Sequence, residues 1–283
     1  MATAAPPGLA MSDLPRLLLG SLLLRPYVFA FLVLHLVGAS ALLGWRRTAG
    51  FTLITWGVAL GAEHSSIRTG IPFGWYYYIP RTADRELWIA GVPFFDSLSF
   101  SFLLVASYGL AWLLLAGVSP CQRPPLAQSR TGWMLPRPGQ GHHVTLTALL
   151  FVLVDVVIDP LALRGDRWFL GQIYGYPEPG VYFGVPLANF LGWGVVGGAA
   201  TALYHAWDRP PLARANFAGR AFLCPGLYFA VLGFNLVLTL VLGEWRLLLC
   251  GLLITLPILL WTLIHLMRPR SLVRRPRAEG RGA

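Results

Sequence analysis

The sequence predicts an all-α fold, a polytopic bundle of about seven transmembrane helices, and two observations carry this prediction. The chain has 283 residues, of which 56% are hydrophobic and only 12% are charged, whereas about one quarter of a soluble domain is charged. Its apolar residues also fall into runs long enough to cross a hydrocarbon core of roughly 30 Å. Because backbone polar groups inside a bilayer must be satisfied within their own segment, we expect these runs to be helices.

The apolar runs set the expected order of elements. We expect spans at about 27–45, 51–67, 92–118, 144–163, 182–205, 222–243 and 246–266. The segment Leu14–Leu24 is apolar but short and contains Arg16, so we expect it to lie along the membrane interface. Its insertion would give eight spans, and the loss of one weaker run would give six. The chain then divides into an interfacial segment 1–26, a single transmembrane domain 27–267 and a disordered basic tail 268–283.

The distribution of charge predicts the orientation. All 22 basic residues are arginine, and the net charge is +10. With the spans above, eight arginines lie on the side of the N-terminus and fourteen on the opposite side, six of them in the tail. The positive-inside rule then places the C-terminus in the cytoplasm and the N-terminus outside, in a membrane of the bacterial inner type. The arginines form no groove-sized patch, so we expect no nucleic-acid partner, whereas the tail suits anionic membrane lipid.

Two polar stretches between the spans are rich in glycine, proline and aromatic residues. They run from Glu63 to Pro80 and from Trp168 to Trp193. Tryptophan and tyrosine gather at membrane interfaces without any catalytic purpose, but three consecutive tyrosines beside Pro72-Phe73-Gly74 exceed that need. Stiff turns, many rings and a few carboxylates are typical of the walls of a site for an apolar ligand. The side chains expected to line it are Phe73, Trp75, Tyr76, Tyr78, Trp168, Tyr182, Asn189 and Trp193.

The same two stretches belong to an internal repeat of helix pairs. Residues 91–96 read Gly-Val-Pro-Phe-Phe-Asp, and residues 184–189 read Gly-Val-Pro-Leu-Ala-Asn. Each follows an aromatic loop, and each loop follows a helix with a carboxylate near its outer end. Proline in a first helical turn costs no hydrogen bond, and glycine allows a loop to approach a helix end closely. Each repeating unit therefore consists of a helix that carries an acid, an aromatic loop, a Gly-Val-Pro sequence and a second helix that carries Asp96 or Asn189.

Four carboxylates lie at membrane depth, where an ionisable group suggests function. Asp155 and Asp159 are four residues apart and share one helix face, while Glu63 and Asp96 lie near the outer ends of their helices. Structural explanations compete for three of them. Asp159 precedes Pro160 and could end a helix, Glu63 could pair with Arg68, and Asp96 could cap its helix. Asp155 is surrounded by valine and isoleucine, which leaves it without such an explanation.

The residue types indicate proton chemistry rather than metal or redox chemistry. The three cysteines are far apart, and no His-x-x-His or His-x-x-x-His pair, phosphate-binding loop or dinucleotide fingerprint is present. We therefore expect no metal and no cofactor. Burial in an apolar setting favours the protonated form of a carboxylic acid, which could protonate an alkene. Aromatic faces could hold the resulting cation. Attack by water would complete a hydration, and attack by a neighbouring double bond would complete a cyclisation.

A family resemblance rests on residues of both loops. They are Glu63, Gly70, Pro72-Phe73-Gly74, Tyr76 or Tyr78, Gly91-Val92-Pro93 and Asp159-Pro160, then Trp168, Gly180, Tyr182, Gly184-Val185-Pro186, Asn189 and Gly192-Trp193. With this pattern, residues 50–200 resemble the integral-membrane carotenoid biosynthesis family, whose members include bacterial and archaeal carotenoid hydratases. The resemblance implies the addition of water to the terminal double bond of an acyclic carotenoid end group, giving a tertiary alcohol. It implies an acyclic or monocyclic carotenoid and water as substrates, in a pathway with other carotenoid enzymes.

The residues lead to one main hypothesis and three rivals. Glu63 and Asp155 are the first candidates for proton donor and water-activating base, in either assignment, with Asp96 and Asp159 in reserve. Asn189 would orient water or the new hydroxyl. A carotenoid end-group cyclase would need the same acid in a dry cavity. A proton-coupled carrier of lipid or small solute would need acids accessible from both faces, and a non-catalytic pigment-binding protein would tolerate loss of the acids.

Overall fold

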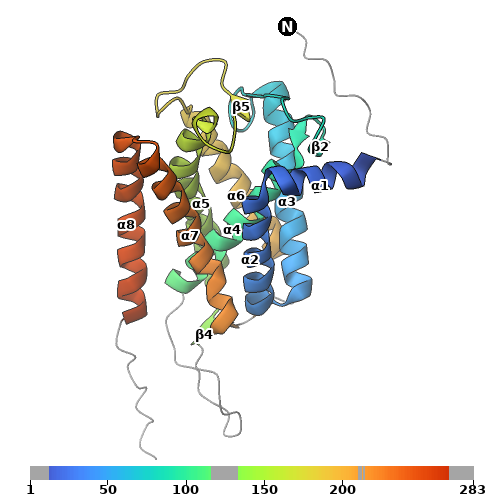
Figure 1. The fold of residues 1–283 in the computed structure, drawn as a ribbon. Coiled ribbons are helices and arrows are strands. Elements are labelled where there is room, and N and C mark those ends of the chain that lie inside the picture. The colour runs from blue at the N-terminus through green and yellow to red at the C-terminus, as the bar shows by residue number, and fades with distance from the viewer. Residues whose placement is uncertain (1–12, 116–132, 210–211, 213, 268–283) are drawn as a thin grey trace, which may run out of the picture.

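The computed structural model describes residues 13–115, 133–209, 212 and 214–267. The described part is an all-helical bundle with three short two-stranded sheets (Figure 1). Six helical segments are long and apolar enough to cross a membrane, which confirms the predicted polytopic bundle. Its helices are α1 (Leu14–Leu24), α2 (Pro26–Leu43), α3 (Trp45–Thr69), α4 (Phe94–Leu115), α5 (Gln140–Ala162), α6 (Leu187–Trp207), α7 (Leu223–Val241) and α8 (Trp245–Met267).

The expected span at 51–67 is helix α3, which is less apolar than the other six. It has 25 residues, enough for about 37 Å at 1.5 Å per residue. Its lower hydropathy comes from Arg46, Arg47, Glu63 and Arg68. It packs against α4 and α6 and runs along the bundle with them (Figure 1). That α3 crosses the membrane stays a prediction.

Helix α1 lies across the bundle rather than along it (Figure 1). Ser21 links α1 to the segment that precedes α4, because the Ser21 hydroxyl accepts a hydrogen bond from the backbone N–H of Leu87 at 2.9 Å. Leu19 and Leu23 on its outer side are exposed. This orientation favours the predicted interfacial position of 1–26, which stays a prediction. The predicted tail 268–283 lies outside the described residues.

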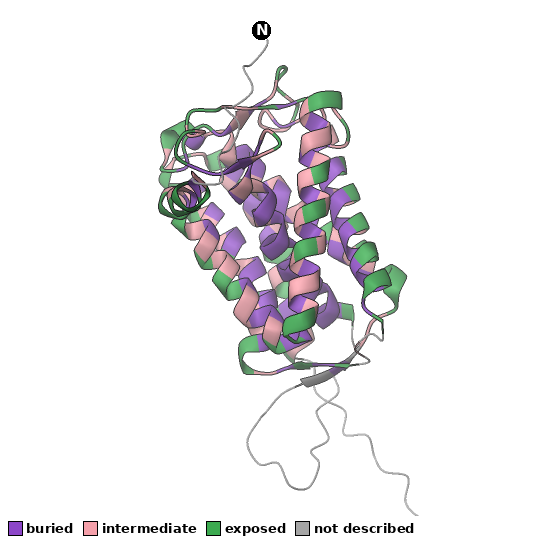
Figure 2. Ribbon diagram, turned by 90° about the vertical axis from the view of Figure 1, so that its right-hand side faces the viewer, coloured by how far each residue is buried: buried purple, intermediate pink, exposed green. Residues whose placement is uncertain are grey.

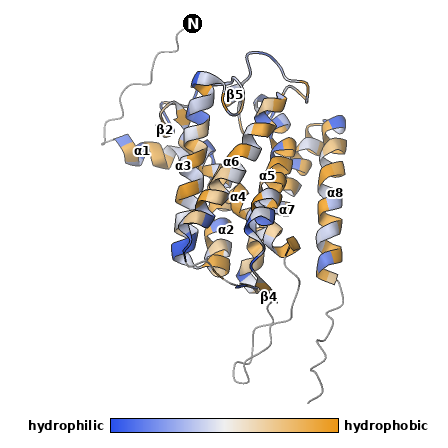
Figure 3. Cartoon of the chain, turned by 180° about the vertical axis from the view of Figure 1, so that it is seen from behind, coloured by the Kyte–Doolittle hydropathy of each residue, from blue (hydrophilic) through white to orange (hydrophobic). Residues whose placement is uncertain are grey.

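Helix α4 forms the centre of the bundle. Nearly all of its residues are buried, as the purple ribbon at the core of Figure 2 shows. It packs against α2, α3, α5 and α7. Small Ser97, Ser101 and Ser107 let these neighbours approach, as is usual for helices that pack in membranes. By contrast α8 lies at the edge and exposes an apolar face, and Figure 3 shows it mostly orange with paler bands and blue near its ends.

Helices α4 and α6 begin later than the apolar runs predicted. In each case the Gly-Val-Pro sequence belongs to a β-hairpin and not to the first turn of the helix. Strands β2 (Trp88–Ile89) and β3 (Val92–Pro93) pair before α4, and bridges join Gly180 to Gly184 and Tyr182 to Val185 before α6. The two turn residues have positive φ in both copies, 53° and 85° at Ala90-Gly91 and 52° and 95° at Phe183-Gly184. Such a pair of angles is typical of a tight hairpin turn.

The two copies of the repeat meet at a short sheet. Strand β1 (Tyr77–Tyr78) pairs antiparallel with β5 (Tyr174–Gly175), so that Tyr78 lies opposite Tyr174. The hairpin glycines also pack alike, since a Cβ on Gly91 would meet Ile67 of α3 and one on Gly184 would meet Leu163, the residue that follows α5, both at 3.4 Å. The repeat read from the sequence is therefore a repeat of structure, with α3 and α4 matching α5 and α6.

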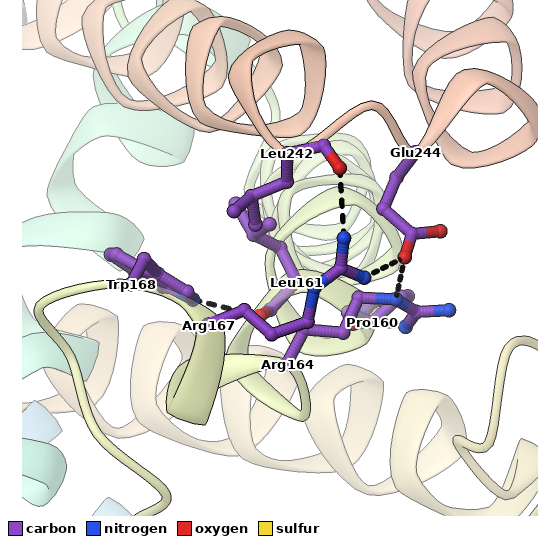
Figure 4. Close-up of polar contacts among 7 residues, drawn as sticks. All are labelled: Pro160, Leu161, Arg164, Arg167, Trp168, Leu242 and Glu244. Atoms are coloured by element: carbon purple, nitrogen blue, oxygen red, sulfur yellow. Dashed lines mark hydrogen bonds and ion pairs between the residues drawn. The ribbon is translucent and has the colours of Figure 1, made fainter.

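An ion-pair cluster fixes the second aromatic loop to the turn between α7 and α8 (Figure 4). Arg164 Nε lies 3.1 Å from Glu244 Oε1, and Arg167 binds the same oxygen. Arg167 also donates to the carbonyl of Leu242 at 2.8 Å. Burial opposes ionisation, but the two guanidinium groups outweigh it and hold the pKa of Glu244 below its ordinary value.

At the opposite end of the bundle, β4 (Trp133–Pro136) pairs with β6 (Arg214–Phe217).

Candidate active site

The four membrane-depth acids converge beneath the two aromatic loops, in two hydrogen-bonded groups. The first group joins α3, β1 and α4. The hydroxyl of Tyr78 lies 2.9 Å from Glu63 Oε1 and 2.7 Å from Asp96 Oδ2. A hydroxyl has one proton to donate, so it satisfies both contacts only when one carboxyl group donates to it. The group therefore holds a proton shared among Glu63, Tyr78 and Asp96.

Tyr78 keeps its own proton in this group. Burial, reinforced by the neighbouring carboxyls of Asp96 and Glu63, holds the pKa of Tyr78 well above its ordinary value. The phenol is therefore a neutral link that can receive a proton from one carboxyl and pass its own to the other.

The second group joins α5, β5 and α6 around Asp159. Tyr174 donates to Asp159 Oδ1 at 2.9 Å, and Tyr176 and the Asn189 amide donate to Oδ2 at 3.2 and 2.7 Å. The same amide donates to Asp155 Oδ2 at 2.8 Å. Three donors on one carboxyl group favour its ionised form. The second group thus surrounds one carboxyl group with donors, whereas the first shares a proton between two carboxyl groups.

The two groups are counterparts within the repeat. Glu63 and Asp159 each precede their tyrosine by 15 residues, and Asp96 and Asn189 each come three residues after a hairpin proline. The exchange of an acid for an amide at this last position makes the halves chemically different. Sequence reasoning did not include Tyr174 and Tyr176 in the site, although the equal spacing from the acid could have revealed Tyr174.

Both groups face a small polar cavity of about 50 Å³. One water needs roughly 10–15 Å³ of such space, so the cavity has room for water beside a reacting carbon. Phe100 stacks on Trp193 at 4.3 Å between ring centroids, and Tyr76 meets Phe73 edge to face at 6.4 Å. Its lining residues are Glu63, Phe73, Tyr76, Tyr78, Asp96, Phe100, Asp159, Tyr174, Tyr176, Asn189 and Trp193.

Four of the expected site residues lie elsewhere. Asp155 is buried behind Asn189 and does not line the cavity. Trp168 lines a neighbouring apolar cavity. Trp75 is 57% exposed, and Tyr182 packs against Phe183 and Phe190; neither lines a cavity described here. Two other polar residues tie elements together: His64 bonds the hairpin carbonyl of Ala90 at 2.7 Å, and His35 bonds Thr52 at 2.8 Å.

Comparison with known proteins identifies the family of this chain. Residues 21–258 match the family described as carotenoid biosynthesis protein. A bisanhydrobacterioruberin hydratase of Haloarcula japonica is 31% identical over 171 residues, which is 59% of this chain. The match spans about half the length of that relative, 49%. No solved structure matches the chain. Because the family match covers most of the sequence, the chain belongs to the carotenoid biosynthesis protein family.

Proposed function

We propose that this protein adds water to the terminal double bond of an acyclic carotenoid end group and so forms a tertiary alcohol. One observation carries the proposal. A cavity with room for water lies between a group that holds a proton, Glu63–Tyr78–Asp96, and a carboxylate with three donors, Asp159. Hydration of an alkene needs an acid on one side of the double bond and a base for the attacking water.

The acid step begins at Asp96. Its carboxyl proton moves to the less substituted alkene carbon, and the π electrons form the new C–H bond. The positive charge is left on the tertiary carbon, where the faces of Trp193, Phe100 and Tyr76 stabilise it. Glu63 then returns a proton to Asp96 through the Tyr78 hydroxyl.

The base step belongs to Asp159. The oxygen of a water molecule attacks the tertiary cation while one of its protons moves to the Asp159 carboxylate. The reaction adds one water to the alkene. Afterwards Asp159 carries one extra proton, and the Glu63–Tyr78–Asp96 group lacks one proton. Transfer of that proton across the cavity restores both groups, with Asn189 and Asp155 holding Asp159 in place. We assign these two roles to Asp96 and Asp159, which both line the cavity. The first candidates in the sequence were Glu63, which also lines it, and Asp155, which does not.

The test is conversion of lycopene in a bacterium that accumulates it, with pigments analysed by chromatography and mass spectrometry. We expect a product heavier by one water. Membranes supplied with D₂O should give one carbon-bound deuterium next to the new alcohol. Asp96→Asn and Asp159→Asn should lose the product, whereas Asp166→Asn, which changes an exposed acid in the turn after α5, should keep it. A product of unchanged mass that absorbs at shorter wavelength would instead establish a cyclase and refute the hydratase.

A further inference from the structure

A second cavity, of about 120 Å³, adjoins the polar one and is apolar. It lies among α2, α4, α5 and α7, and its walls include Tyr27, Phe31, Phe102, Ile158, Val231 and Phe234. The two cavities share four residues: Asp96, Asp159, Tyr174 and Trp193. The two carboxyl groups therefore stand at the boundary between a space that suits water and a space that suits hydrocarbon.

We propose that this apolar cavity is the slot that binds the end group of the carotenoid, with the rest of the polyene leaving between α2 and α7 into the lipid. The assignment rests on the proposed function, because it places the terminal double bond beside Asp96 and Asp159. An end group held in the slot reaches both carboxyls without displacing water from the polar cavity.

The size of the slot requires an exit for the rest of the ligand. A cavity of 120 Å³ encloses an end group but not a polyene of many isoprene units. The remainder must pass through a wall, and the wall toward α2 and α7 is made of aromatic side chains. Phe234 stacks on Tyr27 at 6.1 Å and meets Phe31 edge to face at 6.0 Å between centroids. Rings at a seam between helices can turn aside without breaking backbone hydrogen bonds.

The arrangement of the helices agrees with an exit at this seam. Helix α7 is inclined, so α2 and α7 diverge toward the end of the bundle that carries the aromatic loops (Figure 1). Trp168 and Phe169 of the second loop extend the aromatic wall, at 6.4 and 6.3 Å from the ring of Phe234. Val33 and Val237 on the outer surfaces of the two helices are exposed and apolar, as a lipid-facing surface requires. A long apolar ligand therefore meets hydrocarbon along its whole path.

The slot is tested by filling it from two different helices. Ile158→Phe narrows it from α5, and Leu103→Phe narrows it from α4. Leu253→Phe makes the same kind of change on the exposed side of α8, away from the seam, and is the matched control. Each full-length protein is purified from the lycopene-accumulating strain. Carotenoid carried per protein is read from visible absorbance, and the hydrated product is measured in the same cells.

We expect each slot variant that is recovered as a monodisperse protein to carry at least tenfold less carotenoid and to form at least tenfold less product. Leu253→Phe should match the unaltered protein in both. If both slot variants are monodisperse and keep their carotenoid and product, the slot assignment is wrong. If the unaltered protein carries carotenoid that the slot variants lose, but adds no water, the slot stands and the proposed hydration fails.

Discussion

At the scale of single residues, Tyr78 and Asn189 decide how four acids share one small site. Tyr78 joins Glu63 to Asp96 through one hydroxyl, and Asn189 joins Asp155 to Asp159 through one amide. Carboxyl groups this close repel one another when ionised. A neutral linker in each pair relieves that repulsion and fixes the geometry. The sequence identified the acids and both linkers as site residues, but it could not pair them, because the partners lie 15 to 34 residues apart.

The linking role of Tyr78 predicts the effect of removing one oxygen. Tyr78→Phe keeps the ring but breaks both hydrogen bonds, so the proton of Glu63 no longer reaches Asp96. We expect product formation to fall by about 10²-fold, the usual contribution of a positioned acid. Tyr77→Phe, its 50%-exposed neighbour, should leave the rate unchanged. The measurement is product formed per unit of protein in lycopene-containing membranes, and equal rates for both variants would rule out the link.

At the scale of elements, the hairpins and the β1–β5 pair bring the loops over the helix ends. The sequence predicted that Gly-Val-Pro opens a helix, whereas each copy forms the second arm of a hairpin and the helix begins after the proline. A two-residue turn with positive φ at both positions is typically indicated by a sequence such as Asn-Gly. Phe183-Gly184 lacks this signal, so the sequence did not predict the hairpin. Pairing of Tyr78 with Tyr174 depends on contact between distant loops, which periodicity cannot show.

Close packing of the first loop on α6 predicts a strict requirement for glycine at position 192. A Cβ at Gly192 would lie 2.4 Å from Phe73 Cδ1 and 2.9 Å from the carbonyl oxygen of Pro72, so the loop that carries Phe73 must move. We expect Gly192→Ala to lower stability by about 1–3 kcal/mol, as overpacking does, and to reduce product strongly. Gly198→Ala on the same helix meets only Ala148 Cβ at 4.0 Å and should be neutral. Thermal unfolding in detergent, followed by circular dichroism, distinguishes the two; equal midpoints would contradict the packing argument.

At the scale of the whole molecule, one end of the bundle carries the candidate active site (the reactive end), and the full sequence places more arginines on the opposite side. All four acids and both aromatic loops lie at one end, while Arg47 and Arg137 meet Asp208 at the other. The count of arginines predicts that the reactive end faces outward and the C-terminus inward. The carotenoid would then react near the outer surface of the membrane, with water reaching the polar cavity from that side.

Reporter fusions test this orientation. Green fluorescent protein fused after Ala283 should fluoresce, because it folds in the cytoplasm, and alkaline phosphatase fused at the same point should be inactive. The same two reporters inserted in the second aromatic loop, after Glu178, should give the opposite pattern. Fluorescence at the loop and phosphatase activity at the C-terminus would show that the chain is inserted the other way round.

The sequence by itself determined the class of fold and the family, and it predicted most of the acids and rings that line the polar cavity. Apolar runs with few charges predict spanning helices because a bilayer offers the backbone no other partner. Buried acids stand out in such runs because an ionisable group is costly there. Only the tertiary structure decided which acids face the cavity, since Asp155 and Asp159 share one helix face and differ only in what packs on them. Tertiary packing likewise formed the apolar cavity, because four helices distant in sequence must meet before it exists.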